Sequence, residues 1–199
     1  MRHTAILSRA VAVAVGAAGA LGLYTVGSAS PDESTERLWA SATIRNADGA
    51  TVGRLTIVGR DRGVVTVQAH GLTPGFHGLH LHSTGICDPK TTDPNGNRVP
   101  FLSAGPHLGA GQHGQHAGDL PLLLVGQDGT GSAQVRTDRL TGGALFDADG
   151  TAVIVHAGPD NYANIPTRYS SGASPGPDAA TSATGDSGGR FACGVLTRY

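Results

Sequence analysis

Short alternating segments separated by glycine-rich turns run through most of this chain, and they constrain its fold more than any other feature. Residues 39–45 alternate between apolar and polar side chains, and the turn signal 46–49 follows them. After residue 30, no window of ten or more residues carries a helical period. Short strands with such turns predict an all-β antiparallel sandwich or barrel. The predicted strands span residues 39–45, 51–58, 64–70, 76–82, 120–125, 132–137, 151–156 and 191–197.

Two long segments interrupt this rhythm. Residues 83–118 and 157–189 are rich in Gly, Pro, Asp and Ser, and each exceeds thirty residues. Loops of this length inside a compact domain are usually functional or disordered. Because histidines lie in and beside both segments, we interpret them as functional loops.

The first thirty residues differ in composition from the rest. Arg2 and Arg9 precede an uncharged apolar run over residues 10–26, and small residues follow at 27–30. This order predicts a secretory signal peptide over residues 1–30 and a single domain over residues 31–199. A transmembrane anchor is the alternative, although an apolar run of 17 residues with many Ala and Gly is short for a span. We expect a secreted or extracytoplasmic protein with no stable membrane insertion after cleavage.

Charge and cysteine content narrow the function further. The chain has 14 Lys plus Arg against 15 Asp plus Glu, so it lacks the basic excess typical of proteins that bind nucleic acid. In an oxidising compartment, the pair Cys87 and Cys193 is most simply a disulfide. Two unrelated buried thiols are the alternative.

Histidines are unusually frequent, at nine in a lightly charged chain. His80 and His82 are two residues apart on a predicted strand, so both point to one face while Leu79 and Leu81 point to the core. Such a pair is common on exposed surfaces and is weak evidence alone. His156 ends an apolar strand and is a further candidate for a metal ligand.

A second cluster is more specific. His107, His113, His116 and Asp119 place three imidazoles and one carboxylate in a glycine-rich segment. This set suits a four-coordinate zinc ion. A polar loop that happens to contain histidine is the alternative.

Four motifs, in order along the chain, resemble the copper/zinc superoxide dismutase family. They are Gly75-Phe-His-Gly-Leu-His-Leu-His82, Ser103-Ala-Gly-Pro-His107, His116-Ala-Gly-Asp-Leu120 and Gly188-Gly-Arg-Phe-Ala-Cys-Gly-Val195. In residues 156–166, and in its predicted export and acidic charge, the chain resembles the actinobacterial branch of this family in particular. The resemblance implies a flattened eight-stranded antiparallel Greek-key β-barrel.

The resemblance also implies a role for each matched residue. Copper would bind to His80, His82, His107 and His156. Zinc would bind to His107, His113, His116 and Asp119, so His107 would bridge the two metals. Asp160 would hydrogen-bond one imidazole from each set, and Arg190 would attract the substrate anion. Cys87 and Cys193 would form the family's disulfide.

The activity implied is the dismutation of superoxide to dioxygen and hydrogen peroxide by redox-cycling copper, with zinc in a structural role. Arg190 and His107 would be the catalytic residues, superoxide the substrate, and the protein a monomer or homodimer. Only two residues separate His113 from His116, and residues 180–183 lack the family's usual charged pair. The alternatives are a copper-binding or metal-buffering protein of the same fold and a structural β-sandwich module.

Overall fold

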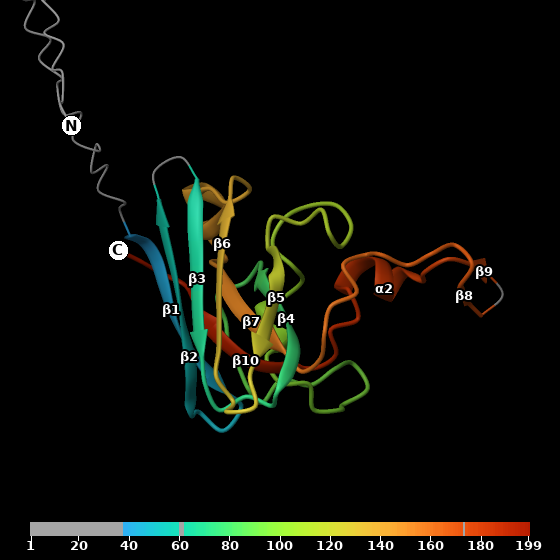
Figure 1. Ribbon diagram of the computed structural model, residues 1–199, viewed down its shortest axis with the longest axis horizontal. Helices are drawn as coiled ribbons and strands as arrows, with labels where there is room; N and C mark the ends of the chain where they lie inside the picture. The colour runs from blue at the N-terminus through green and yellow to red at the C-terminus, as the bar shows by residue number, and fades with distance from the viewer. Residues whose placement is uncertain (1–37, 60–61, 173) are drawn as a thin grey trace, which may run out of the picture. The chain divides into compact units, whose positions relative to one another are not determined.

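Eight strands form a closed antiparallel β-barrel in the computed structural model, which describes residues 38–59, 62–172 and 174–199 (Figure 1). Each strand lies within two residues of a predicted one, and the predicted fold class is confirmed. The secretory signal predicted for residues 1–30 lies outside the described residues. The barrel strands are β1 (Leu38–Asn46), β2 (Thr51–Gly59), β3 (Gly63–Ala69), β4 (Gly75–His82), β5 (Asp119–Val125), β6 (Gly131–Thr137), β7 (Ala152–His156) and β10 (Arg190–Val195).

The strand order shows that the chain does not simply meander. Neighbouring strands follow the order β10-β7-β4-β5-β6-β3-β2-β1, and β1 pairs with β10 to close the barrel. Pairing of β3 with β6 and of β4 with β7 joins strands that are distant in sequence. The two long connections, β4–β5 and β7–β10, instead join strands that are neighbours in the barrel.

The remaining elements are short. Strand β11 (Thr197–Arg198) pairs with β1, and β8 (Ser170–Ser171) pairs with β9 (Ser174–Pro175). Helix α1 (Gly142–Leu145) precedes β7, and α2 (Ala179–Thr184) lies in the β7–β10 connection. The Asp178 side chain accepts a hydrogen bond from Thr181 N at the start of α2, and Gly185 ends the helix with a positive φ of 68°. No helix in the described part of the chain is long and apolar enough to cross a membrane.

The parity predicted for β4 is confirmed. Leu79 and Leu81 lie in the hydrophobic core of the barrel. His80 and His82 lie on the opposite face, yet they too are buried. The two long connections bury them, because these segments cover the outer face of β4.

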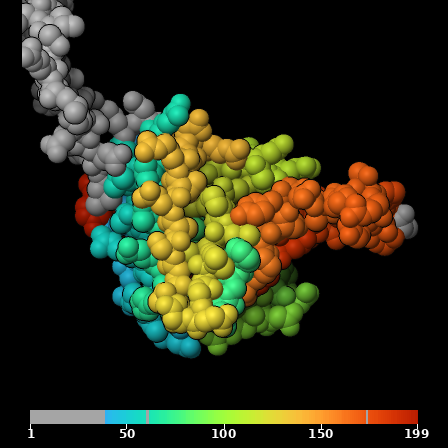
Figure 2. All heavy atoms as spheres, in the orientation of Figure 1, coloured from blue at the N-terminus to red at the C-terminus, as the bar shows by residue number. Residues whose placement is uncertain are grey.

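The β4–β5 connection returns alongside β4. Leu108 N donates to Leu81 O, and a β-bridge pairs His107 with His82. The predicted disulfide is present, since Cys87 in this connection is bonded to Cys193 on β10. In the space-filling view, the β7–β10 connection lies against the β4–β5 connection, where His113 N donates to Ser182 O (Figure 2).

Candidate metal centre

Two barrel strands and one connection bring the predicted copper ligands together. His80 and His82 come from β4, and His156 ends β7, the strand that pairs with β4. The bridge to His82 places His107 beside them. One ligand atom from each of these four residues lies within 4.8 Å of all the others.

Hydrogen bonds hold one nitrogen of three of these imidazoles. His80 Nε2 donates to Asp160 Oδ2 at 2.6 Å. His82 Nδ1 donates to Gly105 O at 2.8 Å, and His156 Nδ1 donates to Gly188 O at 3.2 Å. Because these acceptors carry no proton, the bonded nitrogen must carry it, and the other nitrogen of a neutral ring then presents a lone pair.

The other nitrogens of these rings have no hydrogen-bond partner. His80 Nδ1, His82 Nε2 and His156 Nε2 are buried and unpaired, and so is His113 Nδ1. Leaving a buried polar atom unpaired costs about 1–3 kcal/mol, so converging lone pairs call for a ligand that accepts them. The residues therefore fit a metal ion bound by imidazole nitrogen, and copper is such an ion.

Burial favours the neutral form of His82, His107 and His156. It lowers the pKa of His82 well below the usual value, and the charge of Arg190 lowers it further. Burial and the neighbouring His80 lower the pKa of His156 to about 3. Burial also lowers the pKa of His107. A metal binding at neutral pH would therefore displace no proton from His82 or His156.

A second group of donors surrounds Asp119. Its Oδ1 atom lies 2.8 Å from His107 Nδ1, 3.4 Å from His113 Nδ1 and 3.3 Å from His116 Nδ1. Ligand atoms of His80, His107, His113 and Asp119 all lie within 4.8 Å of one another, and His116 is outside that tighter set. Since His116 Nε2 donates to Gly111 O, its Nδ1 lone pair faces the carboxylate. Three imidazoles and one carboxylate fit zinc.

The carboxylate of Asp119 stays ionised. Burial raises its pKa, but the hydrogen bond from His107 and the neighbouring imidazoles outweigh that effect and lower the pKa to about 2. The predicted zinc donor is therefore an anion at neutral pH.

Asp160 joins the two groups of histidines. Its Oδ2 accepts from His80 Nε2 at 2.6 Å, and its Oδ1 accepts from His113 Nε2 at 2.8 Å. Tyr162 N and Ser187 Oγ donate to the same carboxylate. Burial raises the pKa of Asp160, but the hydrogen bonds from His80 and Tyr162 prevail and hold it well below the usual range. Asp160 thus fixes the orientation of one ring from each group.

A pocket of about 390 Å³ is lined by three of the four histidines, His82, His107 and His156. Its charged lining residues, apart from histidine, are Arg190 and Asp186. The Arg190 guanidinium donates to Phe101 O and Gly105 O, both at 2.6 Å. Register places Arg190 on β10 opposite His156 on β7. The pocket therefore brings a fixed cation beside the unpaired imidazole nitrogens.

Two glycines and a serine in this site make contacts that no local sequence pattern predicts. A Cβ atom on Gly185 would lie 2.3 Å from His113 Nε2, so only glycine allows α2 to pack on that ring. A Cβ on Gly78 would lie 2.4 Å from Ser187 Oγ, so Gly78 makes room for the buried serine that reaches Asp160. The two contacts join residues 72 and 109 positions apart, which no local pattern reveals.

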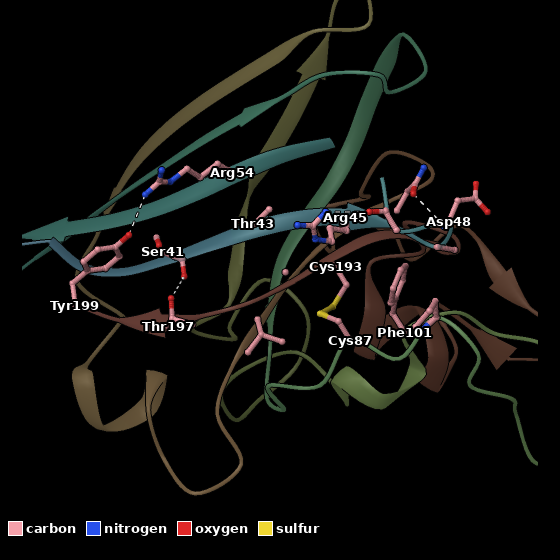
Figure 3. Close-up of a pocket in the computed structure, with 16 residues that line it drawn as sticks. Ser41, Thr43, Arg45, Asp48, Arg54, Cys87, Phe101, Cys193, Thr197 and Tyr199 are labelled. Carbon is pink, nitrogen blue, oxygen red and sulfur yellow. Dashed lines mark hydrogen bonds between the residues drawn. A yellow bond between two sulfur atoms is a disulfide. The ribbon is translucent and has the colours of Figure 1, made fainter. Parts of the chain in front are cut away.

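A second, larger cavity lies elsewhere. It measures about 830 Å³ and is lined mainly by β1, β10 and the β4–β5 connection, with the disulfide in its wall (Figure 3). Its lining includes Arg45, Arg54 and Tyr199 but no histidine. The cavity is therefore separate from the candidate metal centre.

The family follows from comparison with known proteins. Residues 51–196 match the family model for copper/zinc superoxide dismutase (SODC), and the chain belongs to this family. It is 49% identical over 140 residues to a Cu-Zn superoxide dismutase of Mycolicibacterium paratuberculosis, covering 66% of this chain and 62% of the relative. A Cu-Zn superoxide dismutase of Salmonella typhimurium is 32% identical over 176 residues, which cover 83% of this chain and 89% of the relative.

Solved structures agree with this assignment. The Cu/Zn superoxide dismutase of Brucella abortus is similar with a TM-score of 0.55 and 29% identity, over 78% of this chain and 98% of that one. The predicted likeness to the actinobacterial branch is confirmed by relatives from mycobacteria. The matched region spans 62% and 58% of the length of two of those relatives.

Proposed function

We propose that this protein dismutates superoxide, using copper held by His80, His82, His107 and His156. The observation that carries the proposal is the convergence of unpaired, buried imidazole nitrogens beside a pocket that contains Arg190. Copper, when bound, supplies the one-electron redox chemistry by which one superoxide is oxidised and a second is reduced. With two protons, two superoxide anions give one dioxygen and one hydrogen peroxide.

Arg190 captures the substrate. Its guanidinium is fixed by two carbonyl oxygens, so it presents a positive charge in the pocket without reorganising. A positive charge in the pocket attracts the superoxide anion. A protein that only stores copper has no need of this cation, so Arg190 favours dismutation over metal buffering.

His107 is proposed to deliver a proton to the product. Among the histidines that the structure describes, it alone lines the pocket and also belongs to both groups of donors. Its Nδ1 is directed at Asp119, which leaves Nε2 on the side of the pocket histidines. A proton held at His107 Nε2 is therefore available to hydrogen peroxide as it forms.

Zinc is proposed to bind at His107, His113, His116 and Asp119. The support is the arrangement of three Nδ1 atoms within 3.4 Å of one carboxylate oxygen. Zinc has no redox chemistry, so its role here is to hold His107 and the β4–β5 connection.

Secretion and a monomeric or homodimeric state complete the proposal. The disulfide supports an oxidising, extracytoplasmic location, because cytosolic thiols are kept reduced. The predicted signal peptide over residues 1–30 supports export. Light scattering during size-exclusion chromatography of the purified protein would distinguish a monomer from a homodimer.

The test replaces one proposed copper ligand and one uninvolved histidine. His156→Ala should nearly abolish dismutation while the barrel stays folded, because the variant loses one of four ligands. His70→Ala is the matched control, since His70 is exposed and lies outside both groups of donors. Copper content and superoxide consumption are measured for both. Wild-type activity with full copper loading in His156→Ala would refute the ligand assignment.

A further inference from the structure

The short turn between His113 and His116 is held from the inside by Asp119. Gly114 adopts a φ of 85°, a conformation that glycine reaches without strain. Gly114 N and His116 N donate to Asp119 Oδ2 at 2.7 and 3.1 Å. One carboxylate oxygen therefore fixes both amides of the turn, while the other oxygen faces the three imidazoles.

The same turn is held from the outside by Arg139. Its guanidinium donates to Gly114 O at 3.2 Å and to His116 O at 3.3 Å. Arg139 belongs to the β6–β7 connection, is exposed, and forms no ion pair among the described residues. Arg139 thus binds two carbonyl groups of the turn, and Asp119 binds two of its amide groups.

We propose that Arg139 is a positioning residue for zinc, holding the Gly114–His116 turn so that His113 and His116 face Asp119 before the ion arrives. The inference rests on the proposed zinc site. Gly109, Gly111 and Gly114 all have positive φ, so this segment loses much conformational freedom when it is ordered. Ordering the turn in advance reduces the free energy that zinc binding must supply.

Two effects of Arg139 oppose each other. Its hydrogen bonds favour zinc binding through the turn, whereas its positive charge repels a dication. Water and salt screen the charge of an exposed side chain strongly. The hydrogen bonds should therefore prevail, and removing Arg139 should weaken zinc binding rather than strengthen it.

The experiment measures zinc affinity by chelator competition on the full chain, with and without copper loading. Arg139→Met keeps side-chain length and loses the donors, and we expect about five- to ten-fold weaker zinc binding. Arg139→Lys restores a donor and should return the affinity to within about three-fold of the wild type. Arg136→Met, an exposed arginine of β6, is the matched control and should leave the affinity unchanged. Thermal unfolding of the metal-free forms shows whether each variant folds.

Cobalt(II) in place of zinc provides a second readout. The visible spectrum of bound cobalt(II) reports the geometry of its ligands. A variant that only lowers the overall stability of the fold would leave this spectrum unaltered. We expect an altered spectrum in Arg139→Met and a wild-type spectrum in Arg136→Met. Tighter or unchanged zinc binding in Arg139→Met, or equal effects of the two variants, would overturn the proposal. So would a wild-type protein that binds no zinc. A wild-type protein that binds zinc but does not dismutate superoxide would instead refute only the proposed function.

Discussion

Removing the disulfide should destabilise the barrel by a calculable amount. The bond closes a loop with a sequence separation of 106 between Cys87 and Cys193. In the chain-entropy description, a loop of this length stabilises the folded state by about 4 to 5 kcal/mol. For a domain of this size, that corresponds to a fall in Tm of roughly 10 to 15 °C. We expect this fall in the double variant Cys87→Ala, Cys193→Ala.

The assay is thermal unfolding of the metal-free protein in three forms: oxidised wild type, reduced wild type and the double variant. Alanine suits position 193 because Cys193 is buried against apolar neighbours such as Phe101 and Ile154. The disulfide lines the large cavity, so a small reductant can reach it (Figure 3). A loss below about 1 kcal/mol in both the reduced and the substituted forms would refute the loop-entropy reasoning.

The same variant should also impair substrate capture. Cys87 tethers the connection whose Phe101 and Gly105 carbonyls anchor Arg190. Loosening that connection frees the guanidinium, so kcat/KM should fall in the copper-loaded variant at unchanged copper content. An unaltered kcat/KM would show that other contacts hold Arg190 in place.

Three further predictions concern charge and protonation. Arg190→Ala should lower activity and flatten its salt dependence with copper content unchanged, because salt screens the long-range attraction of a cation for an anion over about 8 Å at physiological ionic strength. An unchanged rate at low salt would contradict this. Asp160→Asn should weaken the binding of both metals about ten- to hundred-fold in chelator competition, because it removes the anion that accepts a hydrogen bond from one imidazole of each group. Metal affinities equal to those of the wild type would refute this prediction. The metal-free protein should lose stability as the pH falls from about 6.5 towards 3. The pKa of His156 is about 3 in the folded protein, so the unfolded state binds more protons in this pH range. Equal free energies of unfolding in urea at pH 7 and pH 4 would contradict this prediction.

Much of the barrel can be predicted because strand periodicity is local. The alternation in β4 places Leu79 and Leu81 inside and His80 and His82 outside, and the structure agrees. Helix α2 escapes prediction because it is only six residues long and depends on the caps at Asp178 and Gly185 rather than on a hydrophobic period.

The site is less accessible to sequence reasoning, because its decisive contacts are distant along the chain. Family resemblance supplies Asp160, but no pattern indicates that Ser187 donates to it or that Gly78 leaves the space. Arg139 is likewise an ordinary surface arginine in the sequence. The role of Arg139 depends on how the β4–β5 connection folds, because its partner His116 lies 23 residues upstream. Tertiary packing, rather than local propensity, decides each of these contacts.

The carbonyl oxygen of Gly105 accepts hydrogen bonds from both Arg190 and His82, so both of its lone pairs are committed. A substitution that tilts this peptide group would alter anion capture and ligand orientation in a single step. The glycine itself has little freedom to change, because its φ is 75° and a Cβ would lie 2.9 Å from Thr84 Oγ1. Natural or laboratory evolution acting through this peptide cannot adjust the proposed anion capture by Arg190 independently of the proposed copper ligand His82. Variants selected here for one property should therefore carry a correlated change in the other.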